Sequence, residues 1–300
     1  MLLDTGSPSI WVPSDRVDRN LWVGKSLLNV AQASSLLVGR DAFHQRYGSG
    51  SVAGVKATVH MNFGGMLIQN VPFGLVLAGD ERLYGNPFDG IIGLGRRSIN
   101  PENSNSLFHS LNQQGLMSRK FGFYFRDGGS TFVMGDNLVQ LISDPVIYVN
   151  VVEGPYWETR VTWIFIDGSG FCTEDHRMIL DTGTSKINLP GDIHMAINNV
   201  LGIWRKMQNE YVFDCERLAD LPPITFQIQG KMLQIMPRQY TEQTTTNGVT
   251  TCYTRFQNTS SGYPVGIILG MSFLHSFQLI FDDHAGTVGF SERPGRSSIS

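Results

Sequence analysis

The tripeptide Asp-Thr-Gly occurs twice in the chain, at Asp4 and again at Asp181. Each copy follows two aliphatic residues and precedes a residue with a hydroxyl group, Ser7 in the first copy and Thr184 in the second. Average composition would place two copies of one chosen tripeptide in such a chain only about 0.002 times. Two carboxyl groups within hydrogen-bond reach share one proton, so one is an acid and the other a base in mildly acidic solution. The repeat therefore indicates acid–base catalysis, provided that the fold brings the two aspartates together.

Such a pair of carboxyl groups can hydrolyse an amide bond without a metal ion or a covalent intermediate. The charged carboxylate takes a proton from a bound water as the water attacks the carbonyl carbon, and the neutral carboxyl group donates to the carbonyl oxygen. The glycine in each copy allows a tight turn, and the hydroxyl groups can hold the carboxylates in place. For either copy taken alone, a simple structural turn is the alternative. The residues predicted to support the two aspartates are Thr5, Gly6, Ser7, Thr182, Gly183 and Thr184.

A second motif is repeated at the same distance from each aspartate. Ile91-Ile92-Gly93 follows the first copy and Ile268-Leu269-Gly270 follows the second, and the Asp-to-Gly separation is the same in both halves (93 − 4 = 270 − 181 = 89). Equal spacing of two motifs predicts an internal duplication. We expect two β-rich lobes, residues 1–145 and 146–300, each with one acidic turn and one apolar strand. Related lobes tend to pack about a pseudo-twofold axis, which would bring the two aspartates together.

The bulk composition indicates a well-packed globular protein. Of the 300 residues, 41% are hydrophobic and only 16% are charged, and 33 are glycine. Alternating or apolar stretches at 51–61, 121–125 and 132–134 predict strands, whereas apolar faces with helical spacing predict helices over about 106–114 and 192–201. The predicted fold class is mainly β, with a few short helices.

Composition also argues against several classes of function. The net charge is −3 and no basic run is present, which disfavours a nucleic-acid partner. The longest apolar runs are far too short for a membrane span. The 3 cysteines form no Cys-x-x-Cys motif and the 7 histidines show no metal-ligand spacing, so we expect neither a metal ion nor another cofactor. We expect a monomer that acts on protein or peptide substrates.

Together, these motifs resemble the pepsin-like aspartic proteases, a bilobal family of eukaryotic acid endopeptidases. The similarity covers nearly the whole chain, in order, and its motifs are specific in combination. It implies a mainly β fold of two pseudo-twofold-related, barrel-like lobes, and cleavage of proteins between bulky hydrophobic residues at acidic pH. The segments that carry the resemblance are DTGSPSIWVPS, YGSGSVAG, PFDGIIGLG, YWETRVTWIFIDG, LDTGTS and IILGMSFL.

The resemblance implies roles for individual residues around the two turns. Asp4 and Asp181 correspond to the catalytic dyad. Tyr47 corresponds to the tyrosine of a hairpin, the flap, that covers the substrate, with its hydroxyl held by the Trp11 indole and with Gly48–Ser49 at the tip. Without the resemblance, YGSGSVAG is also compatible with a plain hairpin or a phosphate loop, although no Lys-Ser/Thr pair follows it.

Further residues are implied to bind substrate, which would lie extended against the flap. Phe88 and Ile91 correspond to residues that line an apolar pocket for the substrate side chain before the scissile bond. Tyr156 corresponds to a residue that faces the substrate-binding cleft on the other side of the scissile bond, and Ser185 adjoins the second turn. A plain core position is the alternative for the apolar members of this set, and also for Trp11.

The resemblance also implies a disulfide between Cys215 and Cys252 in the second lobe, whereas we expect Cys172 to be unpaired. Asn258 begins an Asn-Thr-Ser sequon, a candidate for N-glycosylation that mildly favours a secretory route. The expected location is therefore the secretory pathway, with a secreted or a lysosomal or vacuolar protein.

The sequence departs from the family in several places, and two of these departures bear on activity. Only residues 1–3 precede the first turn, where the family has a longer segment with a strand, so we expect a chain truncated at its N-terminus. Lys186 places a charge where an apolar residue is common beside the second turn. These departures leave an alternative open, namely a catalytically silent relative that binds peptides or proteins, or an inactive fragment.

Overall fold

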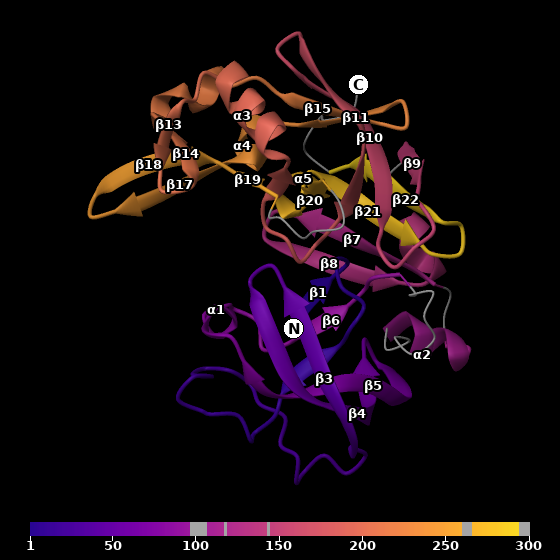
Figure 1. The fold of residues 1–300 in the computed structure, drawn as a ribbon. Coiled ribbons are helices and arrows are strands. Elements are labelled where there is room, and N and C mark those ends of the chain that lie inside the picture. Colours follow the sequence, from indigo (N-terminus) through magenta and orange to yellow (C-terminus); the bar gives the residue numbers. More distant parts are fainter. Residues whose placement is uncertain (97–106, 117–118, 143–144, 260–265, 294–300) are drawn as a thin grey trace. The chain divides into compact units, whose positions relative to one another are not determined.

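The computed structural model describes residues 1–96, 107–116, 119–142, 145–259 and 266–293. The chain forms two compact units (Figure 1). Unit 1 consists of Met1–Ser118 and Gly154–Tyr156, and unit 2 consists of Arg119–Glu153 and Trp157–Ser300. Both units are mainly β with a few short helices, which confirms the predicted fold class.

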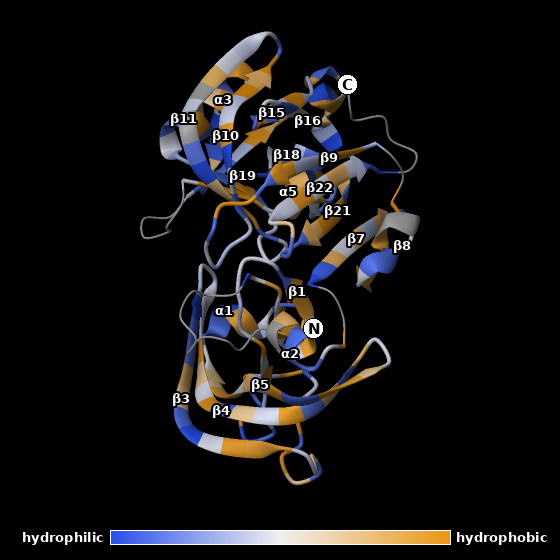
Figure 2. Ribbon diagram, turned by 90° about the vertical axis from the view of Figure 1, so that its right-hand side faces the viewer, coloured by the Kyte–Doolittle hydropathy of each residue, from blue (hydrophilic) through white to orange (hydrophobic). Residues whose placement is uncertain are grey.

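Within its described residues, unit 1 contains a six-stranded sheet and two helices. The strands are β1 (Leu2–Asp4), β2 (Trp11–Pro13), β3 (Leu37–Tyr47), β4 (Gly50–Phe63), β5 (Met66–Gly79) and β6 (Ile91–Gly93), and the helices are α1 (Glu81–Tyr84) and α2 (Leu107–Gln113). The strand order is β1-β6-β2-β5-β4-β3. Hydrophilic and hydrophobic residues are interspersed along the long strands β3 and β4 (Figure 2). The first six residues of β3 are exposed, whereas β4 contributes the buried Val52 and Ala57 to the core.

Unit 2 contains three sheets. Its strands are β7 (Lys120–Arg126), β8 (Gly129–Met134), β9 (Val146–Asn150), β10 (Glu158–Ile166), β11 (Ser169–Leu180), β12 (Ile187–Leu189), β13 (Arg205–Met207), β14 (Glu210–Phe213), β15 (Ile224–Ile228), β16 (Lys231–Ile235), β17 (Thr241–Thr246), β18 (Val249–Thr254), β19 (Phe256–Asn258), β20 (Ile267–Leu269), β21 (Phe277–Asp282) and β22 (Thr287–Glu292). The helices are α3 (Gly191–Val200), α4 (Pro237–Tyr240), α5 (Met271–Leu274) and the 3-10 helices η2 (Asp136–Gln140) and η3 (Cys215–Asp220).

The sheets of unit 2 have the orders β16-β15-β10-β11-β20-β12-β19, β13-β14-β18-β17 and β8-β7-β21-β22-β9. The last sheet joins strands from both ends of the unit. Residues 119–142, expected in the first lobe, therefore pack in unit 2, where β7 pairs with β21. The lobe boundary at residue 145 stays a prediction about the duplication, whereas packing divides the chain after Ser118.

Each unit has its own buried core. In unit 1, Trp11, Trp22 and Phe43 pack in one apolar cluster. In unit 2, Phe121 stacks on Phe281 with ring centroids 4.9 Å apart. Large aromatic side chains contribute most to burial in such cores, so they fix the sheets that present the turns.

The predicted duplication is visible in the strand pairing within each unit. β1 pairs in parallel with β6, where Leu2 lies opposite Ile91, and β11 pairs in parallel with β20, where Ile179 lies opposite Ile268. The strand that follows each turn, β2 or β12, pairs antiparallel with the same partner. Each Asp-Thr-Gly turn thus occupies the same place in an equivalent pair of strands.

The helices and strands predicted from the periodicity are confirmed, with small shifts at their ends. The helix expected near 106–114 is α2, and the helix expected near 192–201 is α3. The strands expected at 51–61, 121–125 and 132–134 lie within β4, β7 and β8.

Candidate active site

The first candidate catalytic residue, Asp4, ends β1 and is only 4% exposed. The Gly6 N–H donates to Asp4 Oδ1 at 2.9 Å, and the Ser7 hydroxyl donates to Asp4 Oδ2 at 2.5 Å. The Leu94 N–H donates to the Asp4 backbone carbonyl at 2.7 Å, so the segment after β6 also supports the turn. These bonds fix the orientation of the carboxylate. Thr5, between the aspartate and the glycine, is fully buried.

The second candidate, Asp181, directly follows β11 and is held in the same way. The Gly183 N–H donates to Asp181 Oδ1 at 2.7 Å, and the Thr184 hydroxyl donates to Asp181 Oδ2 at 2.6 Å. The Asp181 N–H donates to the Leu269 carbonyl at 3.1 Å, and Thr182 is buried. In both turns, the amide two residues ahead and the hydroxyl three residues ahead bind equivalent oxygens. Asp4 belongs to unit 1 and Asp181 to unit 2.

The two glycines of the repeated apolar motif let β6 and β20 approach the turns closely. A Cβ atom on Gly93 would lie 2.4 Å from the Ser9 nitrogen, and one on Gly270 would lie 2.3 Å from the Lys186 carbonyl oxygen. Both distances are well inside van der Waals contact. The Gly93 N–H donates to the Ser9 carbonyl and the Gly270 N–H donates to the Lys186 carbonyl, each at 3.1 Å. A residue with a side chain would clash with the turn at either position, so both motifs require glycine.

The candidate flap is the hairpin between β3 and β4 in unit 1. Tyr47 lies opposite Gly50 in the ladder, so Gly48–Ser49 forms an exposed two-residue loop. The Trp11 Nε1–H donates to the Tyr47 hydroxyl oxygen at 2.8 Å. Trp11 is 1% exposed, so the bond ties the hairpin to the buried core of unit 1.

Burial raises the pKa of the Tyr47 phenol, and the negative charge of Asp4 raises it further. Hydrogen bonding to Trp11 and Ser7 lowers the pKa of the phenol, but by less than burial and Asp4 raise it. Tyr47 therefore keeps its proton at every pH at which the aspartates could work, and its hydroxyl can donate to a neighbouring group.

Replacement of Tyr47 by Phe tests this arrangement, because it removes the acceptor of the Trp11 N–H and keeps the ring. We expect kcat/KM for peptide cleavage to fall about 10-fold, the equivalent of one hydrogen bond to a buried group. The matched control is Tyr148→Phe, because Tyr148 is 48% exposed. Equal kcat/KM values for the two variants would contradict a functional role for the Trp11–Tyr47 bond.

The residues predicted to line the apolar pocket have different exposure. Ile91 is 3% exposed and belongs to the core cluster that contains Trp11. Phe88 is partly buried and packs against the same cluster. Phe88 thus has accessible surface with which to contact a ligand, whereas Ile91 supports the cluster from within.

The remaining predicted ligand-binding positions are accessible to different degrees. Tyr156 is partly buried and packs as part of unit 1, although a segment of unit 2 separates it in sequence from the rest of that unit. Ser185 is exposed, and its carbonyl accepts from the Ser272 N–H at 3.0 Å and from the Ser272 hydroxyl at 2.8 Å. Asn258, the sequon residue, is exposed at the end of β19. Its exposure allows glycosylation.

One charged group near the second turn has a partner that sequence reasoning missed. The Lys186 Nζ donates to Glu210 Oε1 in β14 and lies 5.8 Å from the centre of the Tyr253 ring. The lysine charge, unusual at this position, is therefore paired within unit 2. Glu210 lies 24 positions after Lys186 in the sequence, in a strand that approaches the turn only in the folded chain. The residues around Lys186 in the sequence therefore do not indicate this pair.

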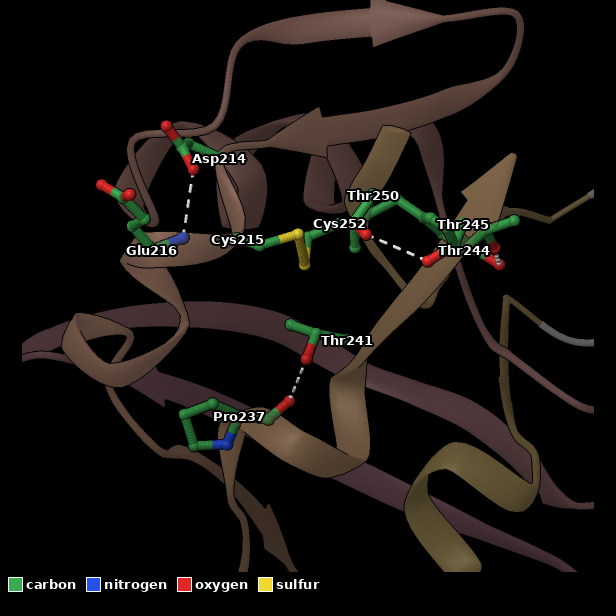
Figure 3. Close-up of a disulfide and its surroundings, with 10 residues drawn as sticks. Asp214, Cys215, Glu216, Pro237, Thr241, Thr244, Thr245, Thr250 and Cys252 are labelled. Carbon is green, nitrogen blue, oxygen red and sulfur yellow. Dashed lines mark hydrogen bonds between the residues drawn. A yellow bond between two sulfur atoms is a disulfide. The ribbon is translucent and has the colours of Figure 1, made fainter. Parts of the chain in front are cut away.

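A disulfide joins Cys215 at the start of η3 to Cys252 in β18, with a Cα–Cα distance of 5.2 Å (Figure 3). Beside it, the Asp214 side chain accepts from the Glu216 N–H at 3.1 Å and caps η3. By restricting the unfolded chain, such a bridge stabilises the fold by about 3–4 kcal/mol. Cys172 lies in β11, and its side chain falls outside the described residues.

Within the described ranges, no group of three or more His, Cys, Asp or Glu side chains is arranged to hold a metal ion. Likewise, no helix in the described part of the chain is both long enough and apolar enough to cross a membrane.

In each of the two turns, an aspartate accepts from a glycine N–H and from a hydroxyl group in equivalent positions, and each turn lies beside a strand that requires glycine. The chain belongs to the eukaryotic aspartyl protease family, whose model matches residues 1–293. It is an aspartic-type endopeptidase, a hydrolase, by this membership and by its similarity to named proteases.

Several curated proteases are similar to nearly the whole chain. Probable vacuolar protease A of Trichophyton verrucosum (strain HKI 0517) is 30% identical over 302 residues, which cover 97% of this chain and 74% of that protein. Human cathepsin D is 28% identical over 316 residues, covering 97% and 76%. Human gastricsin is 28% identical over 303 residues, covering 97% and 77%.

Proposed function

We propose that Asp4 and Asp181 form one catalytic dyad that hydrolyses peptide bonds in proteins at acidic pH. The observation that supports this proposal most strongly is the identical hydrogen bonding of the two carboxylates. In each, one oxygen accepts from a glycine N–H and the other accepts from a hydroxyl group. A carboxylate oxygen has more than one acceptor site, so each group can also bind a water or a substrate.

In the proposed reaction, the ionised aspartate takes a proton from a water, and the water oxygen forms a bond to the scissile carbonyl carbon. The protonated aspartate gives its proton to the carbonyl oxygen, which yields a neutral tetrahedral diol. The aspartate that took its proton from the water then gives a proton to the amide nitrogen, and the other aspartate, now ionised, takes a proton from a diol hydroxyl. The C–N bond breaks, and the products are a carboxylic acid and an amine. The hydroxyl groups of Ser7 and Thr184 orient the two carboxylates throughout.

We propose that the substrate is an extended polypeptide with bulky hydrophobic residues beside the scissile bond. The partly buried ring of Phe88, packed on the cluster around Trp11, supports an apolar pocket on the side of Asp4. The hairpin that carries Tyr47 ends in an exposed loop, Gly48–Ser49, which suits strand-like pairing with a peptide.

The protein is proposed to act as a monomer in the secretory pathway, either secreted or in a lysosomal or vacuolar compartment. The internal duplication supplies one catalytic turn from each half of a single chain, so a second copy is not needed to complete the dyad. The disulfide between Cys215 and Cys252 is of a kind that persists in oxidising compartments. The exposed Asn258 is the proposed glycosylation site, and one of the similar proteases is named as vacuolar.

The test is cleavage of a denatured protein substrate by the purified full-length protein, from pH 2 to pH 7. We expect cleavage that peaks below neutral pH and is blocked by a statine-type transition-state analogue. Mass spectrometry of the products should place most cuts between bulky hydrophobic residues. Binding of the statine peptide without cleavage at any pH would instead identify a catalytically silent peptide-binding relative.

A further inference from the structure

We propose that Asp80 is a positioning residue that holds the Tyr47 hairpin in place for substrate binding. Asp80 connects β5 to α1 and lies outside both catalytic turns. The proposal rests on the proposed function, because it assigns Asp80 to the same flap. It concerns how the hairpin is anchored, and not the chemical step itself.

Three hydrogen bonds join Asp80 to Ser51, which lies one residue beyond the Tyr47–Gly50 pair that closes the hairpin loop. The Ser51 N–H donates to Asp80 Oδ2 at 2.5 Å, and the Ser51 hydroxyl donates to the same oxygen at 3.0 Å. The Asp80 N–H donates in turn to the Ser51 carbonyl at 2.9 Å. Bonds to a charged carboxylate are stronger than bonds between neutral groups, so this contact is suited to hold an exposed segment.

The carboxylate makes these bonds instead of capping its own helix. Aspartate is favoured at the residue before a helix because its side chain can accept from the first-turn amides. Asp80 occupies that position before α1 but makes no such side-chain bond. The β4–β5 ladder ends where Val52 lies opposite Gly79, and the Asp80 side chain extends the pairing by one residue toward the hairpin loop.

The contact between Asp80 and Ser51 lies next to the flap residues. Gly50, which pairs with Tyr47, immediately precedes Ser51, and a Cβ atom on Gly50 would lie 2.9 Å from the Asp80 Cβ. Gly50 also has a φ of +143°, which a residue with a side chain rarely adopts. A displacement of Ser51 therefore moves Tyr47 relative to Trp11 and to the first catalytic turn.

The charge of Asp80 is preserved in acid. Hydrogen bonds from the Ser51 N–H and hydroxyl lower the pKa of Asp80 below its ordinary 3.8, and the positive charges of Arg82 in α1 and Arg46 in β3 act in the same direction. A carboxylate with a lowered pKa stabilises the hairpin above its unfolded pKa, and that contribution is lost as the pH falls through the folded pKa. The anchor therefore persists over most of the acidic range in which the dyad is proposed to work.

The test is the variant Asp80→Ala in the full-length protein, with Asp18→Ala as the matched control. Asp18 is an exposed aspartate of unit 1 that accepts from the Asn20 N–H at 2.9 Å, away from the hairpin. We expect Asp80→Ala to raise KM for a peptide substrate about 10-fold at pH 5, with kcat within about twofold, because the hairpin contacts substrate in both the ground and transition states. A KM within about twofold of the control variant would overturn the proposal.

A second variant, Asp80→Asn, separates the effect of the carboxylate charge from the effect of the side-chain shape. Asp80→Asn keeps an acceptor oxygen for Ser51 but cannot ionise. The ratio of KM in Asp80→Asn to KM in the unmodified protein should fall toward one as the pH drops below the pKa of Asp80, because the native carboxyl is then neutral as well. A ratio independent of pH, or equal to one throughout, would contradict anchoring by the charged carboxylate.

A measurement that does not depend on catalysis can show whether Asp80 anchors the hairpin even if the proposed function is wrong. Hydrogen exchange of the segment around Ser51, followed without substrate, should be at least about 10-fold faster in Asp80→Ala than in the unmodified protein. The middle of β5 serves as the internal control and should exchange equally in both. If the protein cleaves nothing, the proposed function fails and the exchange result alone decides the anchor, with unchanged exchange at Ser51 overturning it.

Discussion

Asp4→Asn and Asp181→Asn will each lower kcat/KM for peptide cleavage by about 10³-fold or more, while the protein stays folded. Asparagine keeps the shape of aspartate and its acceptor oxygen, so the bonds from Ser7 or Thr184 can remain. It cannot take a proton from water or give one to the carbonyl oxygen, so the chemical step loses its base or its acid. The measurement is kcat/KM at the pH optimum, with the fold checked by circular dichroism.

The control for this experiment is Asp167→Asn, an exposed aspartate with a φ of +47°, a conformation that asparagine also tolerates. It should retain full activity. Because the two catalytic carboxyls act as a unit, the double variant of Asp4 and Asp181 should lose little more than either single variant. More than a tenth of native activity in either single variant would contradict the dyad.

Gly93→Ala and Gly270→Ala will each destabilise their unit by about 3 kcal/mol or more, because a methyl group has no space beside the turn. At Gly93 the added Cβ would lie 2.4 Å from the Pro8 carbonyl carbon, and at Gly270 it would lie 2.2 Å from the Thr184 carbonyl oxygen. These neighbours are backbone atoms, so relief requires movement of the strand or of the turn that holds the aspartate. Activity should therefore fall together with stability.

The measurement is urea unfolding of the full-length protein, with each unit followed separately because the two need not unfold together. Gly85→Ala is the matched control: Gly85 has a φ of −75°, and an added Cβ meets nothing within 4 Å. This control should be neutral or slightly stabilised. If Gly93→Ala and Gly270→Ala are as stable as Gly85→Ala, the close approach of strand and turn is contradicted.

The sequence contained enough information to predict the repeated turns, because their signal is local and occurs twice. Asp-Thr-Gly, the following hydroxyl and the later glycine all lie at fixed positions in each half, and the structure places them in equivalent strand pairs. The helices α2 and α3 were also predictable, since their apolar residues recur with helical spacing. The hydrogen bond between Trp11 and Tyr47 followed from the family resemblance and not from spacing.

Contacts that depend on tertiary packing could not be predicted in this way. The Asp80 carboxylate accepts from Ser51, which lies 29 residues earlier, and no local sequence pattern indicates this pair. The sequence shows an unusual charge at Lys186 beside the second turn, but nothing near it indicates its partner, Glu210. In both cases the partner is brought near by neighbouring strands, so only the folded chain reveals it.

The proposed approach of the two aspartates is tested most directly by a crystal structure of the full-length protein with a statine-type peptide. The account predicts that carboxyl oxygens of both Asp4 and Asp181 lie within about 3 Å of the statine hydroxyl, the distance of a hydrogen bond. A well-ordered complex in which the hydroxyl contacts only one aspartate, or in which the two carboxyl groups lie too far apart to share a ligand atom, would contradict it.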